Sequence, residues 1–473
     1  MAAALRLLER GCRVTLYEAE DRLGGKAGTM IGAGPEDEHG YHIFPMWYRN
    51  IWALVEELGI ADHFIDCTEF KQLPAGRYPH AKSFRNITSV RYAWHNLTGG
   101  VLPFHEAFLF FYAALDLMSQ PYRYRARLDQ VTVSGFLRSR FYRTDPVAVQ
   151  FEELMLKGIS VPTYEVSAMT MRNVMRFWVR YPEPMHRILN GNLHEKWIVP
   201  IQERLEALGC EIVTRTRLER LEFAGARAAA VHLRDGSTPA RREVDQLVLA
   251  IPFDRLVPLI DDHVFASVPD LAKIRNLRAR AMAAFNVYFK ERLPGMPWEH
   301  VNLLGSRYGL SFIDVSQVWE GHSGTVLNAI ASDFTSLEGL SDEAALAELM
   351  ADLRRYLPSA TPNAIDHVVF RSHVGEPLFM NNVGGWSFRP EAATQVPNLF
   401  LAGDYCRSHI DLVCMEGALS TGYRAAEALR SAVGLTSPVE VLQPKVYPPW
   451  LMVLGRFALL PLAAAAKLRA LLG

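Results

Sequence analysis

The sequence has few cysteines, hardly any net charge and no long unbroken apolar run. Its five cysteines are scattered without a Cys-x-x-Cys pair, which argues against a zinc site or a disulfide framework and suits a reducing compartment. Fifty Lys and Arg residues against 51 Asp and Glu residues give a net charge of −1, so no broad positive field attracts nucleic acid. No stretch reaches about 18 consecutive apolar residues, which argues against a conventional membrane-spanning helix.

Common catalytic patterns are missing as well. The sequence shows no Walker loop, no metal-ligating cluster and no convincing Ser, His and Asp order, so a bound cofactor has to carry the reaction. The first residues do not read as a signal peptide, because Arg6, Glu9 and Arg10 interrupt the apolar ones. What is present, 473 residues with 49% hydrophobic and 21% charged, predicts a globular cytoplasmic protein of two or three domains.

The N-terminal region has the pattern of one half of an α/β unit. Apolar residues recur at helical spacing over residues 3–8, and Gly11 follows the last turn. Residues 12–17 contain alternating β-formers, and Glu18 comes at the end of this predicted strand. An acid at that point of an open α/β sheet can accept hydrogen bonds from an adenosine ribose, so Glu18 is a candidate nucleotide ligand.

A glycine-rich turn follows this predicted strand. Gly24 and Gly25 let backbone N–H groups approach a ligand closely, while Arg22 and Lys26 supply positive charge. The segment taken alone is equally compatible with an ordinary solvated turn.

The strongest single signal lies near the C-terminus, in residues 396–429. An apolar strand over residues 399–402 runs into Gly403 and Asp404, and a helix punctuated by glycines follows. The start of that helix contains Met415, Glu416, Gly417 and Ala418. The positive end of its dipole favours a site where negative charge accumulates.

A third motif occupies residues 36–60. It consists of Glu38, His39, Gly40, His42 and Phe44. An amphipathic helix with apolar residues at 51, 54, 55 and 58 then ends at Gly59.

These three motifs, in this order, resemble those of the FAD-dependent amine oxidase and phytoene desaturase superfamily. The string Glu18, Arg22, Gly24, Gly25 and Thr29 matches its N-terminal flavin motifs. The Glu-His-Gly-x-His-x-Phe motif is similar to that of plant- and cyanobacterial-type phytoene and ζ-carotene desaturases and their relatives, among them hydroxysqualene dehydroxylase-like proteins. The resemblance implies an α/β fold, in which a Rossmann-like FAD-binding domain carries an inserted α+β substrate-binding domain.

The resemblance also implies which residues hold FAD. Leu218 takes the adenine-facing place, with Leu221 as its rival, and His42 and Phe44 lie near the flavin ring, where His42 is favoured as a wall-shaping residue. The implied cofactor-binding residues are Glu18, Arg22, Gly24, Gly25, Lys26, Gly40, His42, Leu218, Gly403, Asp404, Met415, Glu416, Gly417 and Ala418.

One part of the family pattern is missing, since the first strand and its Gly-x-Gly-x-x-Gly turn would precede Met1. Either Met1 is an internal methionine of a longer natural chain, or the protein is a remnant that no longer holds flavin. We favour the first explanation, because the downstream motifs are intact.

The expected domain organisation alternates between two regions. The FAD-binding parts are residues 1–60, 191–260 and 396–435, and the substrate-domain parts are 61–190 and 261–395. Residues 436–473 form an apolar tail. Its body over 450–473 reads either as a sheltered helix pair or, preferably, as a monotopic anchor to a membrane surface, whereas residues 101–118 are at least as well explained as a core helix.

The expected function is desaturation or dehydrogenation of a long apolar isoprenoid, such as a carotene or squalene derivative, with quinone or oxygen as electron acceptor. The predicted location is the cytoplasm, at the inner face of the membrane. Acid–base candidates are His42, Arg172 and Arg389, which the sequence does not rank. An FAD-dependent amine oxidase or a secondary-metabolite tailoring enzyme is the alternative, and a non-catalytic remnant lacking FAD is the third.

Overall fold

The parallel strands expected around the cofactor form two short pairs. The computed structural model describes residues 1–28, 38, 40–121, 125–181 and 183–472. In it, β1 (Thr15–Tyr17) pairs with β7 (Glu211–Val213), and β11 (Leu247–Leu249) pairs with β19 (Leu399–Leu401), both in parallel. Among the described residues, neither β1 nor β19 has a second named strand beside it, so the two pairs are not joined into one sheet.

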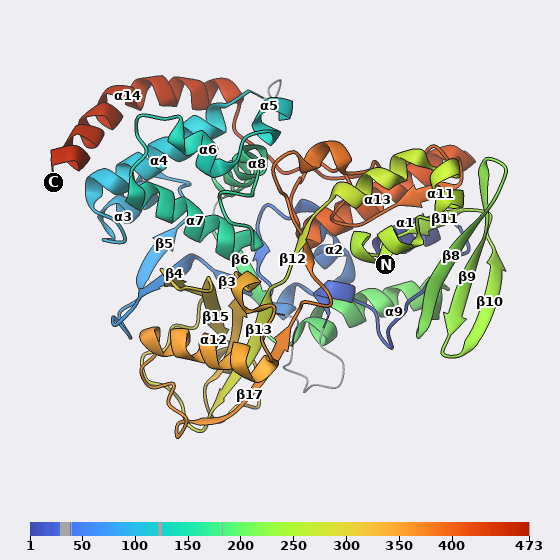
Figure 1. Cartoon of the computed structure of the whole chain (residues 1–473), viewed down its shortest axis with the longest axis horizontal. Helices are drawn as coiled ribbons and strands as arrows, with labels where there is room; N and C mark the ends of the chain where they lie inside the picture. The colour runs from blue at the N-terminus through green and yellow to red at the C-terminus, as the bar shows by residue number, and fades with distance from the viewer. Residues whose placement is uncertain (29–37, 39, 122–124, 182, 473) are drawn as a thin grey trace.

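Helices from both ends of the chain pack beside these strand pairs. α1 (Ala2–Leu8) packs against α13 (Met415–Val433) so closely that a Cβ on Gly422 would lie 2.7 Å from the Ala2 Cβ. Figure 1 shows the N-terminus beside α13. The surrounding helices are α2 (Arg49–Leu58), α9 (Val199–Ala207), α10 (Phe253–Leu256) and α11 (Asp262–Ser267). The predictions for α1, α2 and α13 are confirmed, and Gly59 ends α2 at φ 71°.

An antiparallel sheet extends from this region. Its strand order is β10 (Thr238–Glu243), β9 (Arg227–Asp235) and β8 (Thr216–Ala224). β8 follows β7 directly, as the sequence predicts. The sheet stands at the edge of the molecule in Figure 1, beside α11.

A seven-stranded sheet forms the second region. Its order is β17 (Ile365–Ser372), β13 (Ala283–Phe289), β16 (Val326–Ala331), β15 (Leu310–Asp314), β14 (Val301–Leu304), β4 (Glu69–Pro74) and β5 (Lys82–Arg85). Strands β13 and β16 are neighbours in this sheet and pair antiparallel. α12 (Asp342–Tyr356) packs on this sheet, and the Ser341 hydroxyl caps it by accepting a hydrogen bond from Ala344 N.

The third region is helical. It contains α3 (Val90–Thr98), α4 (Phe104–Ser119), α5 (Arg125–Asp129), α6 (Val133–Arg138), α7 (Asp145–Ile159) and α8 (Ala168–Trp178). Leu109, Ala113 and Leu117 of α4 are completely buried, which makes α4 a core helix.

The apolar tail is one helix, α14 (Pro449–Leu472), and not a helix pair, because the helix continues through Pro461. In Figure 1 it lies along α4. It is also the one described helix that is long and apolar enough to cross a membrane, and only 6% of its most apolar window is buried.

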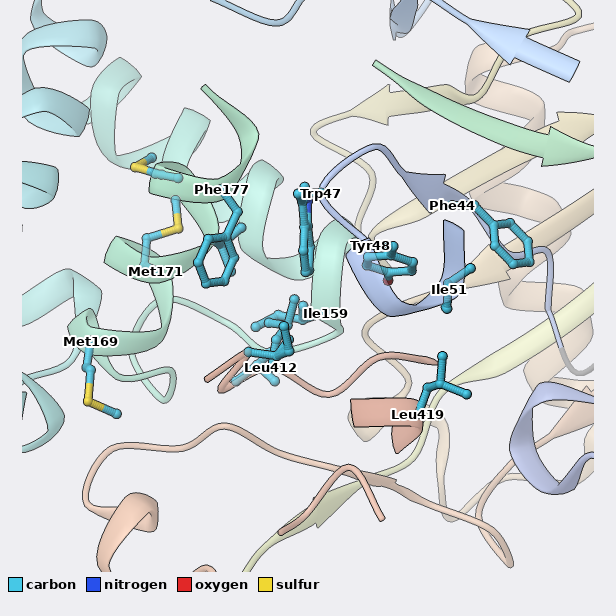
Figure 2. Close-up of a cluster of buried hydrophobic side chains, with 14 of the residues drawn as sticks. Phe44, Trp47, Tyr48, Ile51, Ile159, Met169, Met171, Phe177, Leu412 and Leu419 are labelled. Carbon is cyan, nitrogen blue, oxygen red and sulfur yellow. The ribbon is translucent and has the colours of Figure 1, made fainter. Parts of the chain in front are cut away.

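Two small sheets and an apolar cluster join the regions. β6 (His186–Leu189) pairs with β2 (Phe44–Pro45) and β3 (Phe64–Cys67), and β12 (Ala279–Arg280) pairs with β18 (Leu378–Phe379). Figure 2 shows the segment before α2 packed between α8 and the residues around the start of α13. The Trp47 ring there lies 5.2 Å from the Phe177 ring, which packs the segment before α2 against α8.

Candidate active site

The loop after β19 is built so that only glycine suits its first residue. Gly403 has φ 140°, and a Cβ there would lie 2.6 Å from the Tyr405 ring. The Thr421 hydroxyl on α13 accepts a hydrogen bond from Gly403 N at 3.0 Å and donates to Gly403 O at 2.9 Å. The strand end and the helix are therefore held together at Gly403, whose N–H and C=O both bond to Thr421.

Asp404 follows Gly403 in this loop, and two opposing effects act on the pKa of its carboxyl. Burial raises its pKa above the usual aspartate value, while the cations of Lys26 and Arg389 act to lower it. Lys26 also forms an ion pair with Asp254 at 3.5 Å and donates to Pro377 O. Lys26 of the N-terminal motif therefore lies close enough to Asp404 of the C-terminal motif for their charges to interact.

The N-terminal glycine turn is also closely packed at one of its glycines. Gly24 has φ 127°, and a Cβ would lie 3.2 Å from the Gly28 Cα. Arg22 lies beside Asp21, with its Nε 3.4 Å from Asp21 Oδ1. Gly25 follows at φ 55° with nothing near its missing side chain, which leaves space for a ligand. Thr29 and His39, which complete the sequence motifs, lie outside the described residues.

Glu18 sits at the end of β1 as predicted. Its backbone is fixed by two hydrogen bonds, Glu18 N to Val213 O at 2.9 Å and Thr216 N to Glu18 O at 2.7 Å. Burial raises the pKa of its carboxyl, which accepts a hydrogen bond from Glu20 N. Two residues beyond Thr216, Leu218 is half-buried, whereas Leu221 is 1% exposed in the core. Leu218 is therefore the one of the two with surface left for a ligand.

The start of α13 is a close-packed helix N-terminus. The Cys414 Sγ caps it by accepting from Gly417 N, and a Cβ on Gly417 would lie 2.7 Å from Leu412 O. Met415 is partly exposed and Ala418 is exposed.

Glu416 points elsewhere. Its buried carboxylate accepts hydrogen bonds from Asn50 N and Ile51 N, both at 2.9 Å, at the N-terminal end of α2. Burial raises its pKa to about 7, and these donors oppose that rise. The residue therefore connects α13 to α2, and both of its carboxylate oxygens are engaged there with Asn50 and Ile51.

A small cavity lies beside the third motif. Glu38, Tyr41 and His42 line one side of it, and the remaining wall is largely aliphatic, formed by Ile188, Leu189, Leu193, Ile313, Val315 and Val318, with Gly191 and Trp319. Gly40 between the motif residues has φ 135°, and a Cβ would lie 3.1 Å from Ile330 Cδ1. The cavity measures about 20 Å³, room for about one water, so it marks an apolar wall with a carboxyl and an imidazole on one side, a setting that suits proton transfer.

Glu38 is the residue whose role the sequence did not reveal. It is 3% exposed and accepts a hydrogen bond from Leu193 N at 2.5 Å. Burial raises its pKa to about 8, so the carboxyl keeps its proton at neutral pH. The motif identified the position, but only the surrounding apolar wall reveals a carboxylic acid that is neutral at working pH.

Tyr41 leads from this cavity to a buried polar cluster. Its hydroxyl lies 2.5 Å from His300 Nε2 and donates to Ser311 Oγ at 2.6 Å. Burial lowers the pKa of His300 well below the usual histidine value, and that of His186 to about 3. Both imidazoles are therefore neutral in the folded protein.

The two arginine candidates lie apart from the cavity wall. Arg172 is completely buried and donates to Pro121 O at 3.2 Å, which fastens α8 to the end of α4. The Arg389 guanidinium forms an ion pair with Asp411 and donates to three backbone carbonyl groups. Of the three acid–base candidates, His42 is the one among the residues that line the cavity.

The comparisons with known proteins agree with the expected superfamily. The family described as flavin containing amine oxidoreductase matches residues 1–430. The 15-cis-phytoene desaturase of Synechococcus elongatus is 25% identical over 453 residues, which cover 91% of this chain and 93% of that protein. The zeta-carotene desaturase of Synechocystis is 23% identical over 474 residues, which cover 91% and 94%.

Solved structures share the fold. Cyclohexylamine oxidase from Brevibacterium oxydans has a TM-score of 0.61 at 15% identity, covering 92% of this chain and 97% of that one. Putrescine oxidase has a TM-score of 0.63 at 16% identity, covering 92% and 95%.

The described residues fit a flavin dinucleotide. A Cβ would lie 2.6 Å from the Tyr405 ring at Gly403, 2.7 Å from Leu412 O at Gly417 and 3.2 Å from Gly28 Cα at Gly24, so glycine lets these turns pack closely. The N-terminus of α13 offers positive dipole charge. Carboxylate, glycine turn and helix terminus are the donor set that a dinucleotide with a reducible ring requires.

Proposed function

The chain belongs to the flavin-containing amine oxidoreductase family and uses FAD as its cofactor; from this premise we propose that it desaturates a long apolar isoprenoid, such as a carotene or squalene derivative. The observation that carries the proposal is the aliphatic wall beside Glu38 and His42. Its motif resembles that of the carotene desaturases, and two such desaturases are similar to the chain over 91% of its length.

We propose that FAD is held between the N-terminal and C-terminal motifs. Backbone groups of the two glycine turns and of α13 approach it, Arg22 and Lys26 supply cations, and Glu18 accepts from the ribose. The complete proposed set is Glu18, Arg22, Gly24, Gly25, Lys26, Gly40, His42, Leu218, Gly403, Asp404, Met415, Gly417 and Ala418, with Glu416 acting through its hold on α2.

When bound, FAD supplies a two-electron acceptor for the hydrogen removed from an allylic carbon. The aliphatic cavity wall positions the chain of the substrate and excludes water from it. About 0.8 kcal/mol for each buried CH₂ is enough to hold a long hydrocarbon without a polar anchor. Glu38 holds a proton at its carboxyl oxygen, and the His42 imidazole lines the same cavity, where it can accept the proton that leaves the substrate.

We further propose that the protein works on the cytoplasmic surface of a membrane, with quinone or oxygen as the final acceptor. The exposed apolar side of α14 supports this location, because an isoprenoid substrate is dissolved in the bilayer.

Product analysis tests the proposal. Protein loaded with FAD should convert phytoene, ζ-carotene or hydroxysqualene in detergent or vesicles, and amines should remain unchanged. Turnover of amines alone would replace the proposal by amine oxidation, and a folded protein that binds no FAD would indicate a non-catalytic remnant.

A further inference from the structure

We propose that the cavity between α4, the segment after α6 and α14 binds the phosphate headgroup of an anionic phospholipid. This inference rests on the membrane location in the proposed function and adds a specific lipid site to it. The cavity measures about 220 Å³ and is remote from the motif residues of the candidate active site. Its lining includes Asp116, Arg140, Tyr142, Arg456 and Phe457.

Two arginines share one buried carboxylate in this cavity. Asp116 is 1% exposed, and its oxygens lie 2.8 Å from Arg140 Nε and 2.9 Å from Arg456 Nε. Tyr142 also donates to Asp116, at 2.6 Å, and Gln120 donates at 3.0 Å. The carboxylate is therefore fully satisfied, and the three charged groups leave one net positive charge in the cavity.

The arginines keep the part of the guanidinium that binds phosphate. Both contacts to Asp116 use Nε, and the side chains of Arg140 and Arg456 remain 31% and 36% exposed. Arg140 Nη1 donates to Ser139 Oγ at 3.3 Å, and the Tyr112 hydroxyl of α4 makes a side-chain hydrogen bond with Arg456. Planar guanidinium groups bind phosphate oxygens through paired N–H donors, so two of them around one cavity form an anion site.

The surroundings of this cation pair are apolar. Phe141 and Phe457 on the cavity lining are 48% and 61% exposed. The same side of the molecule carries further exposed apolar residues of α14, at Trp450, Leu454, Leu462, Leu468 and Leu471. A soluble anion needs no apolar residues around its binding site, whereas a phospholipid presents a phosphate and acyl chains together.

The charge of the helix agrees with this occupant. Residues 449–472 contain Arg456, Lys467 and Arg469 and no acidic residue. On the neighbouring segment, Asp145 is paired with Arg143 at 2.8 Å, which leaves the positive charges around Asp116 dominant. Basic residues within an apolar surface are the pattern that anionic bilayers attract.

The attachment of α14 fixes its orientation to the body. Ala463 is completely buried, Gly455 faces Leu115 of α4, and Lys467 Nζ donates to Arg143 O at 2.8 Å. One side of α14 is fastened along α4 (Figure 1). The exposed side can therefore lie in the surface of a bilayer, with the cavity beside it at headgroup depth.

Vesicle co-sedimentation of the FAD-loaded full chain tests the site. The wild type should bind phosphatidylcholine vesicles containing phosphatidylglycerol more tightly than vesicles of phosphatidylcholine alone. Arg456→Gln and Arg140→Gln should each reduce that preference by about fivefold, in line with one basic residue at a membrane surface. Arg307→Gln removes one positive charge from a 68% exposed side chain that does not line the cavity and should leave the preference unchanged.

A variant that should raise the preference for phosphatidylglycerol provides a second test in case an arginine variant does not fold. Asp116→Asn retains the shape and leaves both arginines unopposed, so the preference for phosphatidylglycerol should increase. Equal wild-type binding to both kinds of vesicle would overturn the headgroup site while leaving membrane docking and the catalytic proposal intact. Stabilisation by inorganic phosphate without any vesicle binding would overturn the lipid as occupant.

Discussion

Arg389 Nη1 lies 2.7 Å from Asp411 Oδ1, and each of the two side chains is 2% exposed. The remaining donors of the same guanidinium reach the carbonyl oxygens of Asp404, Tyr405 and Cys406. This buried ion pair therefore shapes the loop that follows β19, where the C-terminal motif meets the proposed cofactor. Arg389 acts on the site by positioning that loop.

Removing this guanidinium should destabilise the fold. Arg389→Met leaves a buried carboxylate and three carbonyl groups without their donor, and we expect a loss of about 3–5 kcal/mol in the free energy of unfolding. Arg407→Met is the matched control, since Arg407 also donates to backbone carbonyls nearby but is 30% exposed, and it should cost less than about 1 kcal/mol. Urea denaturation measures both. Lost turnover with unchanged stability in Arg389→Met would instead indicate a catalytic role.

Glu38 should make stability depend on pH in the direction opposite to an ordinary carboxylate. Its folded pKa of about 8 lies above its unfolded value, so between these values the folded protein holds a proton that the unfolded chain has released. Stability from this group is complete at acid pH and is lost as the pH rises to about 8. Glu38→Gln should remove that dependence. Urea titrations at several pH values measure it, and if the free energy of unfolding changes with pH equally in both proteins, this account is wrong.

Buried histidine should make the protein sensitive to acid. His186 is completely buried, stacks on Phe70 at 4.6 Å, and has a pKa lowered to about 3. The unfolded chain takes up a proton as the pH falls below about 6.5 and the folded protein does not, so stability decreases from there towards pH 3. His186→Phe should reduce this acid sensitivity and raise the melting temperature at pH 5. A destabilised, inactive variant would show that the imidazole is required as a polar group.

The glycines of the two flavin motifs should not tolerate a side chain. Gly403→Ala forces a Cβ against the Tyr405 ring at a backbone conformation that alanine avoids, and we expect weaker FAD retention and a loss of about 1–3 kcal/mol. Gly158→Ala is the control, because nothing lies within 4 Å of that position in α7, and it should be neutral or stabilising. The FAD content of the two variants after gel filtration is the measurement. Equal FAD retention by Gly403→Ala and Gly158→Ala would contradict a role of Gly403 in holding the cofactor.

Much of the local structure could be predicted because its signals are local. Gly59 ends α2 and Met415 begins α13 as expected, since caps and apolar spacing act within a few residues. β1 is shorter than expected, covering Thr15–Tyr17 alone, because its length is set by the short partner β7 and not by its own β-formers.

The chemistry of individual side chains depends on contacts that spacing does not encode. Glu416 belongs to the predicted motif, yet its carboxylate is used by Asn50 and Ile51, more than 360 residues away in the chain. Glu38 acquires its raised pKa from an aliphatic wall that β6 and β15 contribute. The tail forms one helix through Pro461, because packing along α4 stabilises both of its halves.

The most direct test of the central claim is anaerobic mixing of FAD-loaded protein with a polyene, followed by its visible spectrum. We predict that ζ-carotene or phytoene removes the oxidised flavin absorbance in one turnover, yields a product with one more double bond, and does so without added amine. Oxidised flavin that persists with every polyene while a primary amine bleaches it would contradict the account, as would a folded, monodisperse protein that refuses FAD.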